Sequence, residues 1–315
     1  PGDEVAWSSV ADLNLKLGHY DAADAALAKL IAISPANPNA YYLLGESRLF
    51  RGQYEDAARH YRKGLQVDAG FGDAALRLAD IEVLRNRPQA AIAQLESLLT
   101  PQKYAPSLRI TAAFNLAALL RAQGRCPDAL AALDRVHGDI AAEKVRQALE
   151  LATRSRCMLD QHDLAQARQL AADAVRLAPG SATRYLFTRG LVEIEAHDAT
   201  AATATIAAIR ALATSDITDR TEQKAADDLQ GLLRLQQGDV AGAVTSLRPA
   251  VSAKGYEYDV YALALARALA RQGNAREARA LARQAILRGS PADLRLDLEP
   301  GRREAARLLA QLGDG

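Results

Sequence analysis

Metal chemistry in this chain of 315 residues would have to come from five histidines and two cysteines, Cys126 and Cys157. A metal site needs its ligands at close and regular spacing, as in the HExxH motif of a helix. The histidines have no such spacing. They are His19, His60, His137, His162 and His197. We therefore expect no bound metal.

Motifs for nucleophilic catalysis and phosphate binding are also missing from the sequence. It contains neither a GxSxG nucleophile elbow nor a GxxxxGK[ST] phosphate loop. Residues 70–75, Gly-Phe-Gly-Asp-Ala-Ala, faintly resemble a dinucleotide loop. Such a loop follows a strand, whereas a helix is expected before residue 70. We interpret this segment as a junction between helices and expect no cofactor.

Paired carboxylates could serve as the acid and base of a glycosidase, which all-helical toroids can be. The nearest candidates are Asp227 with Asp228, and Glu193 with Glu195. Such enzymes stack sugars on aromatic side chains, and this chain has only one Trp and four Phe. A toroid-type enzyme is therefore a remote alternative, and we expect no catalytic residues.

The two cysteines leave two possibilities open. Cys126 is expected to begin one helix and Cys157 to lie in the next, so antiparallel stacking could bring the thiols together. They are either two unlinked thiols or a disulfide formed in an oxidising compartment.

The overall composition favours an all-helical protein without a membrane span. Ala and Leu supply most of the 49% hydrophobic content, and both favour helices. With 39 basic and 38 acidic residues, net charge gives no reason to expect nucleic acid as a partner. No apolar run reaches the ~18 residues that span a bilayer. We expect a soluble protein of the bacterial cytoplasm or periplasm.

A recurring turn organises the chain. Segments 17–23 and 51–57 are alike, and related turns recur every 34 to 42 residues, each followed five residues later by an alanine. The turn markers are Gly18, Gly52, Asn86, Gly124, His162, Ala196, Gly238 and Gly273. The alanines are Ala23, Ala57, Ala91, Ala129, Ala167, Ala201, Ala243 and Ala278. Two antiparallel helices approach closely only where a small residue lies at their crossing, so the pattern predicts eight helix hairpins.

The repeat resembles the tetratricopeptide repeat family over residues 4–292. The second repeat matches the family's signature at Tyr41, Leu44, Gly45, Gly52, Tyr54, Ala57 and Tyr61. This resemblance implies an all-α fold, a right-handed superhelical α-solenoid of about eight stacked helix hairpins. A charged helix after Pro300 and Gly301 is expected to cap it. We expect repeats 1–3 in residues 1–105, repeats 4–5 in 106–181, divergent repeats 6–8 in 182–292, and the cap and tail in 293–315.

The sixth and seventh repeats depart from the pattern. Thr188 and Arg189 stand where a leucine and a small residue are expected, and Asp227 and Gln230 occupy two apolar positions. An alternative apolar face in the seventh repeat runs through Leu229, Leu232 and Leu233. The register there is open. Extra residues near 101–107, 138–147 and 213–223 are expected to form loops.

The resemblance further implies a non-enzymatic scaffold or adaptor that binds a peptide or protein segment. In the family, outward-facing residues of each hairpin's first helix contact a ligand in the concave groove. By register, the predicted partner-binding residues are Tyr42, Glu46, Phe50, Arg77, Asp80, Leu84, Phe114, Asn115, Arg121, Arg156, Arg267 and Arg271. Aromatic and arginine side chains are frequent binding hot spots, and the mixed charges favour a segment that carries both signs.

Two alternatives accompany this prediction. The chain begins without an initiator methionine, so it could be a regulatory or ligand-sensing module of a larger multidomain or envelope-assembly protein. The clamp by which one subtype binds a C-terminal carboxylate is not expected, because its positions here hold Ser8, Asp12 and Leu43. Arg276, Arg279 and Arg283 form either an ordinary charged face or a second docking site, for an acidic partner.

Overall fold

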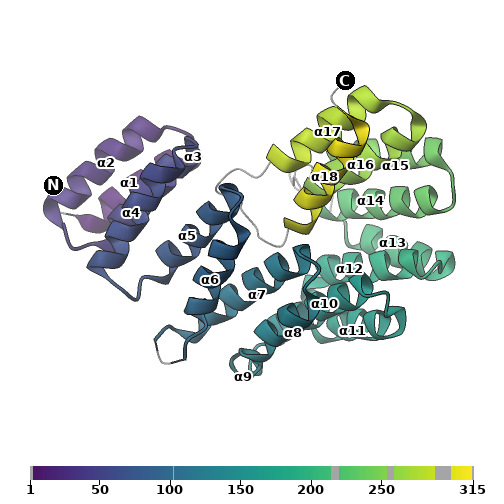
Figure 1. Ribbon diagram of the computed structural model, residues 1–315, viewed down its shortest axis with the longest axis horizontal. Helices are drawn as coiled ribbons and strands as arrows, with labels where there is room; N and C mark the ends of the chain where they lie inside the picture. Colours follow the sequence, from purple (N-terminus) through teal and green to yellow (C-terminus); the bar gives the residue numbers. More distant parts are fainter. Residues whose placement is uncertain (1–2, 102, 214–219, 254–258, 288–298, 314–315) are drawn as a thin grey trace. The chain divides into compact units, whose positions relative to one another are not determined.

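The computed structural model describes residues 3–101, 103–213, 220–253, 259–287 and 299–313 (Figure 1). Regular structure in these residues consists of eighteen α-helices and one short 3-10 helix, without strands. The predicted all-α class is confirmed. The chain divides into two compact units, one ending at Leu116 and the other beginning at Ala117, and each is described by itself.

The first unit is built from hairpins in which consecutive helices pack together. Its helices are α1 (Glu4–Lys16), α2 (Tyr20–Ile33), α3 (Pro38–Phe50), α4 (Tyr54–Val67), α5 (Gly72–Leu84) and α6 (Pro88–Leu98). Helix α7 (Pro106–Ala122) begins in this unit and ends in the next. The hairpins α1/α2, α3/α4 and α5/α6 stack in chain order, because α2 packs on α3 and α4 packs on α5.

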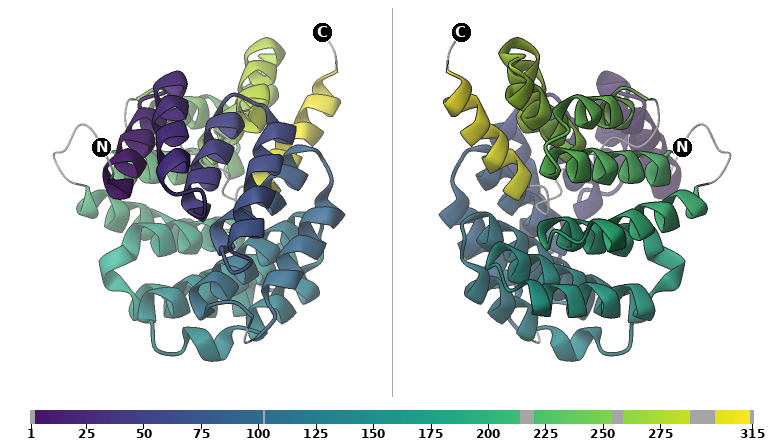
Figure 2. Two further views of the ribbon diagram at one scale, coloured as in Figure 1. Left: turned by 90° about the vertical axis from the view of Figure 1, so that its left-hand side faces the viewer. Right: turned by 90° about the vertical axis from the view of Figure 1, so that its right-hand side faces the viewer.

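The second unit repeats this arrangement. Its helices are α8 (Cys126–Asp134), α9 (His137–Ile140), α10 (Lys144–Asp160), α11 (Leu164–Leu177), α12 (Ala182–Glu195), α13 (Ala199–Leu212), α14 (Thr221–Gln236), α15 (Val240–Ser252), α16 (Asp259–Gln272), α17 (Ala275–Leu287) and α18 (Glu299–Leu312), with the 3-10 helix η1 (Pro179–Ser181) before α12. The hairpins are α10/α11, α12/α13, α14/α15 and α16/α17. Helix α18, yellow in Figure 2, packs against α17 as the expected cap. Part of the loop expected near 138–147 is instead the short helix α9.

Each hairpin turns at a residue in the left-handed backbone region. The φ angles lie between 55° and 89° at Gly18, Gly52, Asn86, Gly124, His162, His197, Gly238 and Gly273. This conformation ends an α-helix and suits glycine best. The sixth turn residue is therefore His197, and the predicted marker Ala196 is wrong by one position.

The alanine five residues after each turn residue is completely buried. In the sixth hairpin this is Ala202, because the turn begins at His197, whereas the predicted Ala201 is only partly buried. The other seven are Ala23, Ala57, Ala91, Ala129, Ala167, Ala243 and Ala278, as predicted. Alanine at this position lets the second helix of the hairpin pack closely.

A second small residue lies seven positions before each turn residue. The eight are Ala11, Gly45, Ala79, Ala117, Ser155, Gly190, Gly231 and Ala266, and all are buried. A Cβ atom on Gly45 would lie 2.3 Å from the Tyr61 ring, and one on Gly231 would lie 2.3 Å from Leu247. Glycine is thus required where a large side chain of the second helix lies against the first.

This position resolves the register of the divergent repeats. In the sixth repeat the small residue is Gly190, whereas the sequence pattern had placed it at position 189. A Cβ atom on Gly190 would lie 2.6 Å from Leu229. In the seventh repeat Gly231 takes the position. The alternative apolar face is confirmed, since Leu229 and Leu233 are buried in the core and Leu232 packs against it.

We expect Gly231→Ala to destabilise the protein by about 1–3 kcal/mol, because its Cβ would overlap Leu247 in a packed core. The free energy of unfolding from urea titrations measures the effect. Gly138→Ala in α9 is the matched control, since nothing lies within 4 Å of a Cβ there. Equal stability of the two variants would contradict the close helix approach.

Candidate functional site

A buried ionic cluster joins the first helices of two successive hairpins, α3 and α5. Glu46 on α3 accepts hydrogen bonds from the Tyr61 hydroxyl of α4 and from Arg77 of α5, whose Nη2 lies 2.9 Å from Glu46 Oε2. Arg77 Nη1 also donates to Asp80 Oδ2 at 3.2 Å. One guanidinium thereby bridges two carboxylates, and the second helix of the hairpin supplies the phenol.

Burial and charge together fix the protonation of this cluster. Burial, followed by the negative charge of Glu46, raises the pKa of Tyr61, so the phenol stays protonated and donates a hydrogen bond to Glu46. Burial would lower the pKa of Arg77, but Glu46 and its neighbours outweigh that effect and raise it.

Aromatic rings hold Tyr42 beside the cluster. Its ring centroid lies 5.7 Å from that of Tyr61 and 5.7 Å from that of Phe71, which it meets edge to face. Burial, and then Glu46, raise the pKa of Tyr42. The Tyr42 ring is therefore fixed in place as a neutral, partly exposed wall of the cluster.

Two of the predicted partner-binding residues are less exposed than expected. Glu46 and Asp80 were expected to face outward, but they are only 6% and 4% exposed because Arg77 and Tyr61 engage them. The other predicted residues of this unit are partly buried. They are Tyr42, Phe50, Arg77, Leu84, Phe114 and Asn115.

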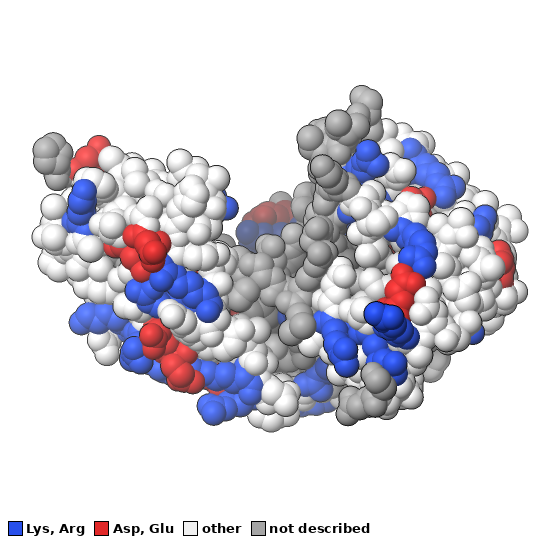
Figure 3. All heavy atoms as spheres, turned by 90° about the horizontal axis from the view of Figure 1, so that it is seen from above, with Lys and Arg blue, Asp and Glu red and all other residues white. Residues whose placement is uncertain are grey.

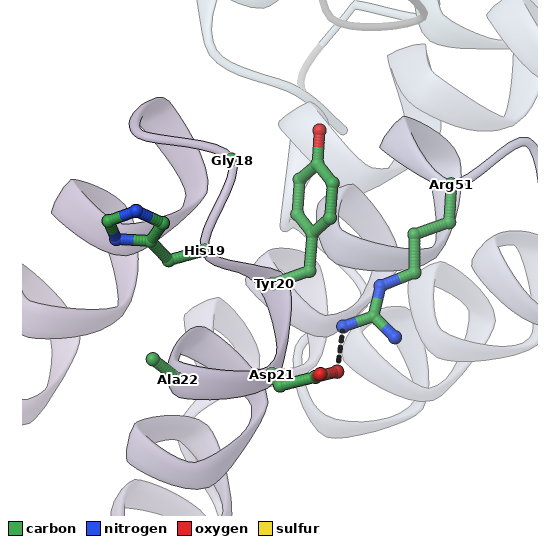
Figure 4. A pocket seen from close by; sticks show the side chains of 6 residues that line it. All are labelled: Gly18, His19, Tyr20, Asp21, Ala22 and Arg51. Carbon is green, nitrogen blue, oxygen red and sulfur yellow. Dashed lines mark hydrogen bonds and ion pairs between the residues drawn. The ribbon is translucent and has the colours of Figure 1, made fainter.

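An open pocket of about 410 Å³ lies at the first turn (Figure 4). It is lined by Gly18, His19, Tyr20, Asp21, Ala22 and Arg51. Arg51 lies 2.9 Å from Asp21 and 3.3 Å from Asp24, and its guanidinium lies over the Tyr20 ring. Phe50 stacks on that ring at 6.0 Å. The pocket thus lies beside the ion pairs that join the second hairpin to the first. None of the predicted partner-binding residues lines it.

In the second unit, the predicted residue Arg121 bridges two first helices. Its Nε donates to Asp160 of α10 at 2.5 Å. Arg156 on α10 is partly buried. Cys126 and Cys157 are buried free thiols, so of the two possibilities the structure shows the unlinked one. Burial raises the pKa of both thiols.

Arg267 and Arg271 lie on α16 in different surroundings. Arg267 forms an ion pair with Glu304 of the capping helix α18. Burial lowers the pKa of Arg267. Arg271 is exposed and donates a hydrogen bond of 3.3 Å to the carbonyl of Leu235 on α14. On the face that Figure 3 shows, Lys and Arg side chains are interspersed with Asp and Glu side chains.

The sequence marked Asp228 on α14 as a candidate carboxylate but did not predict its burial. Asp228 is completely buried, and neither of its carboxylate oxygens has a hydrogen-bond partner among the described residues. Burial raises its pKa well above the ordinary value, and the charge of Arg267 opposes this only in part. Asp227 lies apart from it, 3.4 Å from Arg210 of α13. The only signal in the sequence was the spacing of Lys224 and Asp228, which lie four residues apart and so share one side of the helix.

Two further features of the described residues bear on other kinds of site. Within the residues that the structure describes, no three His, Cys, Asp or Glu side chains gather as metal ligands. Among the described helices, none is both long and apolar enough to cross a bilayer.

Comparisons with known proteins agree with this architecture. Sequence models of the tetratricopeptide repeat match residues 5–37, 48–103 and 229–293. Similar solved structures include a tetratricopeptide repeat protein from Parabacteroides merdae, with 16% identity, a TM-score of 0.61, and 84% of this chain and 98% of that chain covered. No curated protein matches the chain.

Two further solved structures share the fold at low identity. The apo form of RapI has 14% identity and a TM-score of 0.57, with 97% of this chain and 86% of that chain covered. PilW, a type IV pilus biogenesis factor, has 18% identity and a TM-score of 0.51, with 66% and 93% covered.

We expect Asp228→Asn to raise the unfolding temperature at pH 8 by about 3 °C. Because burial raises the folded-state pKa, the stability due to Asp228 is complete below the unfolded carboxyl pKa of about 3.9 and is lost as the pH rises through the folded value. The gain should therefore shrink as the pH falls toward 4. Thermal unfolding across this pH range measures it.

The control for this prediction is Asp12→Asn, which removes an exposed carboxylate that pairs with Lys16 on the surface of α1. It should leave the pH dependence of the unfolding temperature unchanged. A lower unfolding temperature for Asp228→Asn at pH 8 would show instead that the ionised carboxylate is stabilising.

Proposed function

The chain belongs to the tetratricopeptide repeat family, and on that premise we propose that it is a non-enzymatic scaffold that binds a protein or peptide segment along the first helices of its hairpins. The family and the repeat architecture support a role in protein interaction. What we propose beyond this is which residues contact the ligand and what kind of ligand it is.

The observation that carries the proposal is the cluster of Glu46, Arg77 and Asp80 beside Tyr42. Arg77 and Tyr42 remain partly exposed, and arginine and tyrosine are among the residues that dominate binding energy at interfaces. Their partners hold both side chains in one conformation, so little side-chain entropy is lost when a ligand arrives.

Four predicted arginines recur on the first helices of the second unit. Arg121, Arg156, Arg267 and Arg271 all lie on them, and Arg271 is exposed. Guanidinium groups bind carboxylates with two parallel hydrogen bonds. We therefore propose that a ligand segment bound by the second unit carries an acidic side chain that reaches one of these arginines. The balanced net charge of +1 does not favour nucleic acid.

Selection from a displayed peptide library against the purified chain, followed by fluorescence anisotropy, tests the proposal. We expect Arg77→Gln combined with Arg121→Gln to weaken the selected peptides at least about tenfold, because charge-assisted contacts at hot spots are worth more than about 1 kcal/mol. Glutamine retains hydrogen-bonding capacity, and circular dichroism verifies that the variant is folded.

The matched control is Arg59→Gln combined with Arg62→Gln on α4, which removes the same charge from exposed positions of a second helix. This variant should bind within about twofold of the wild type. Equal losses in both double variants, or a selection that yields no specific peptide, would refute binding along the first helices.

A further inference from the structure

Helix α18 packs against α16 and α17 and brings an acidic side chain to one of two neighbouring arginines on α16 (Figure 1). Arg267 and Arg271 are four residues apart, so they share one side of the helix. Burial lowers the pKa of Arg267, and the positive charge of Arg271 lowers it further. Glu304 of α18 forms an ion pair with Arg267. A carboxylate at this point therefore offsets the repulsion between two of the proposed binding residues.

This ion pair repeats a contact of the first unit with the charges exchanged. There Arg77 of α5 pairs with Glu46 of α3, and the two lie nine and six residues before the turn residues of their own hairpins. Gly313, directly after α18, has a φ of 69°, as the turn residues do, so positions on α18 can be counted from it. Glu304 lies nine residues before Gly313, and Arg267 lies six residues before its turn residue. Helix α18 thus meets α16 in the register in which α5 meets α3.

The other first helices are held on the preceding hairpin by two columns of buried side chains. Twelve residues before the turn residue, the side chains of the second to eighth hairpins are at most 3% exposed. They are Ala40, Ala74, Ala112, Glu150, Tyr185, Ala226 and Tyr261. Five residues before the turn residue, the side chains are at most 2% exposed. They are Ser47, Ile81, Leu119, Cys157, Val192, Leu233 and Ala268. Ser47 Oγ, for example, donates to Asp24 Oδ1 of the preceding hairpin at 2.7 Å.

Both columns are weaker on α18. Gly301, twelve residues before Gly313, has no side chain, and Leu308, five residues before it, is only partly buried. Ala305 and Leu308 join α18 to a core cluster that contains Leu263 of α16. An element with few buried apolar contacts opens at a lower free-energy cost than the rest of a protein. Helix α18 can therefore leave α16 more readily than one internal hairpin can leave another.

We propose that α18 is an internal competitor of the ligand. Resting on the proposed function, this inference assigns Glu304 to the place at Arg267 that an acidic side chain of the bound segment takes once α18 has moved away. While Glu304 is there, the charge of Arg267 is balanced, and a ligand carboxylate would meet a second carboxylate. The two side chains are 38% and 41% exposed, so the pair is within reach of an incoming ligand.

Competition of this kind has a signature that a purely structural ion pair lacks. The apparent affinity of a ligand is reduced by the fraction of molecules in which its site is free. Weakening the contact of α18 should therefore strengthen ligand binding, and fixing α18 in place should weaken it. Removal of an ion pair that only orients Arg267 would instead weaken ligand binding, because the arginine would lose its fixed conformation.

The peptides selected for the proposed function serve as the probe, restricted to those that Arg267→Gln weakens. We expect Glu304→Gln to strengthen their binding at least about twofold, since a partly exposed ion pair contributes only a small factor. Glu277→Gln is the matched control, because Glu277 pairs with Arg248 of another second helix, and this variant should bind within about 1.5-fold of the wild type. In the wild type, hydrogen exchange of the α18 amides should become at least about threefold faster when the peptide binds.

A disulfide tests whether α18 must move. A Cβ atom on Gly301 would lie 3.6 Å from Val260 Cγ2 of α16, close enough for Gly301→Cys and Val260→Cys to cross-link. After oxidation with oxidised glutathione, the double variant should bind the same peptides at least about tenfold more weakly, because few molecules then have a free site. Reduction should restore the affinity, and the intact mass verifies both states.

Equal affinity of the oxidised and reduced double variant would overturn the inference. So would weaker binding by Glu304→Gln, α18 exchange that stays unchanged or slows on peptide binding, or selected peptides of which none depends on Arg267. In each of these cases the peptides still bind, so the proposed function stands. A selection without any specific peptide would instead refute the proposed function and, with it, this inference.

Discussion

The close approach of two helices at a pair of small residues is the constraint on which every hairpin of this protein depends. One small residue lies seven positions before the turn, and an alanine lies five positions after it. Where the first is glycine, a large side chain such as Tyr61 or Leu247 lies directly against the backbone. A helical glycine costs about 0.5–1 kcal/mol relative to alanine, and packing of the larger side chain offsets that cost.

Charged side chains form the links between successive hairpins, and these links compete with ligand binding. Arg51 reaches Asp21 and Asp24 of the preceding hairpin, and Arg77 reaches Glu46. Such pairs contribute little net stability, because desolvation offsets most of the Coulomb attraction. They fix the orientation of side chains on the first helices. A ligand bound there as proposed would meet groups that are already hydrogen-bonded, and it would gain affinity from their fixed geometry rather than from pairing an isolated charge.

The sequence predicts the hairpins well because their constraint is local. A turn residue with positive φ and an alanine five positions later recur throughout the chain, including residues 104–228, which the family's sequence models do not match. The error at the sixth turn has a simple origin. Ala201 and Ala202 are adjacent and chemically identical, and only the backbone conformation of His197 shows which of them faces the core.

Side-chain exposure on the first helices was less predictable, because it depends on residues distant in sequence. Glu46 is buried because Tyr61 and Arg77 converge on it from two other helices, and Asp228 is buried on a helix whose sequence looked irregular. A helical repeat pattern specifies which face of a helix packs on its own hairpin. It does not specify which polar residues the next hairpin covers.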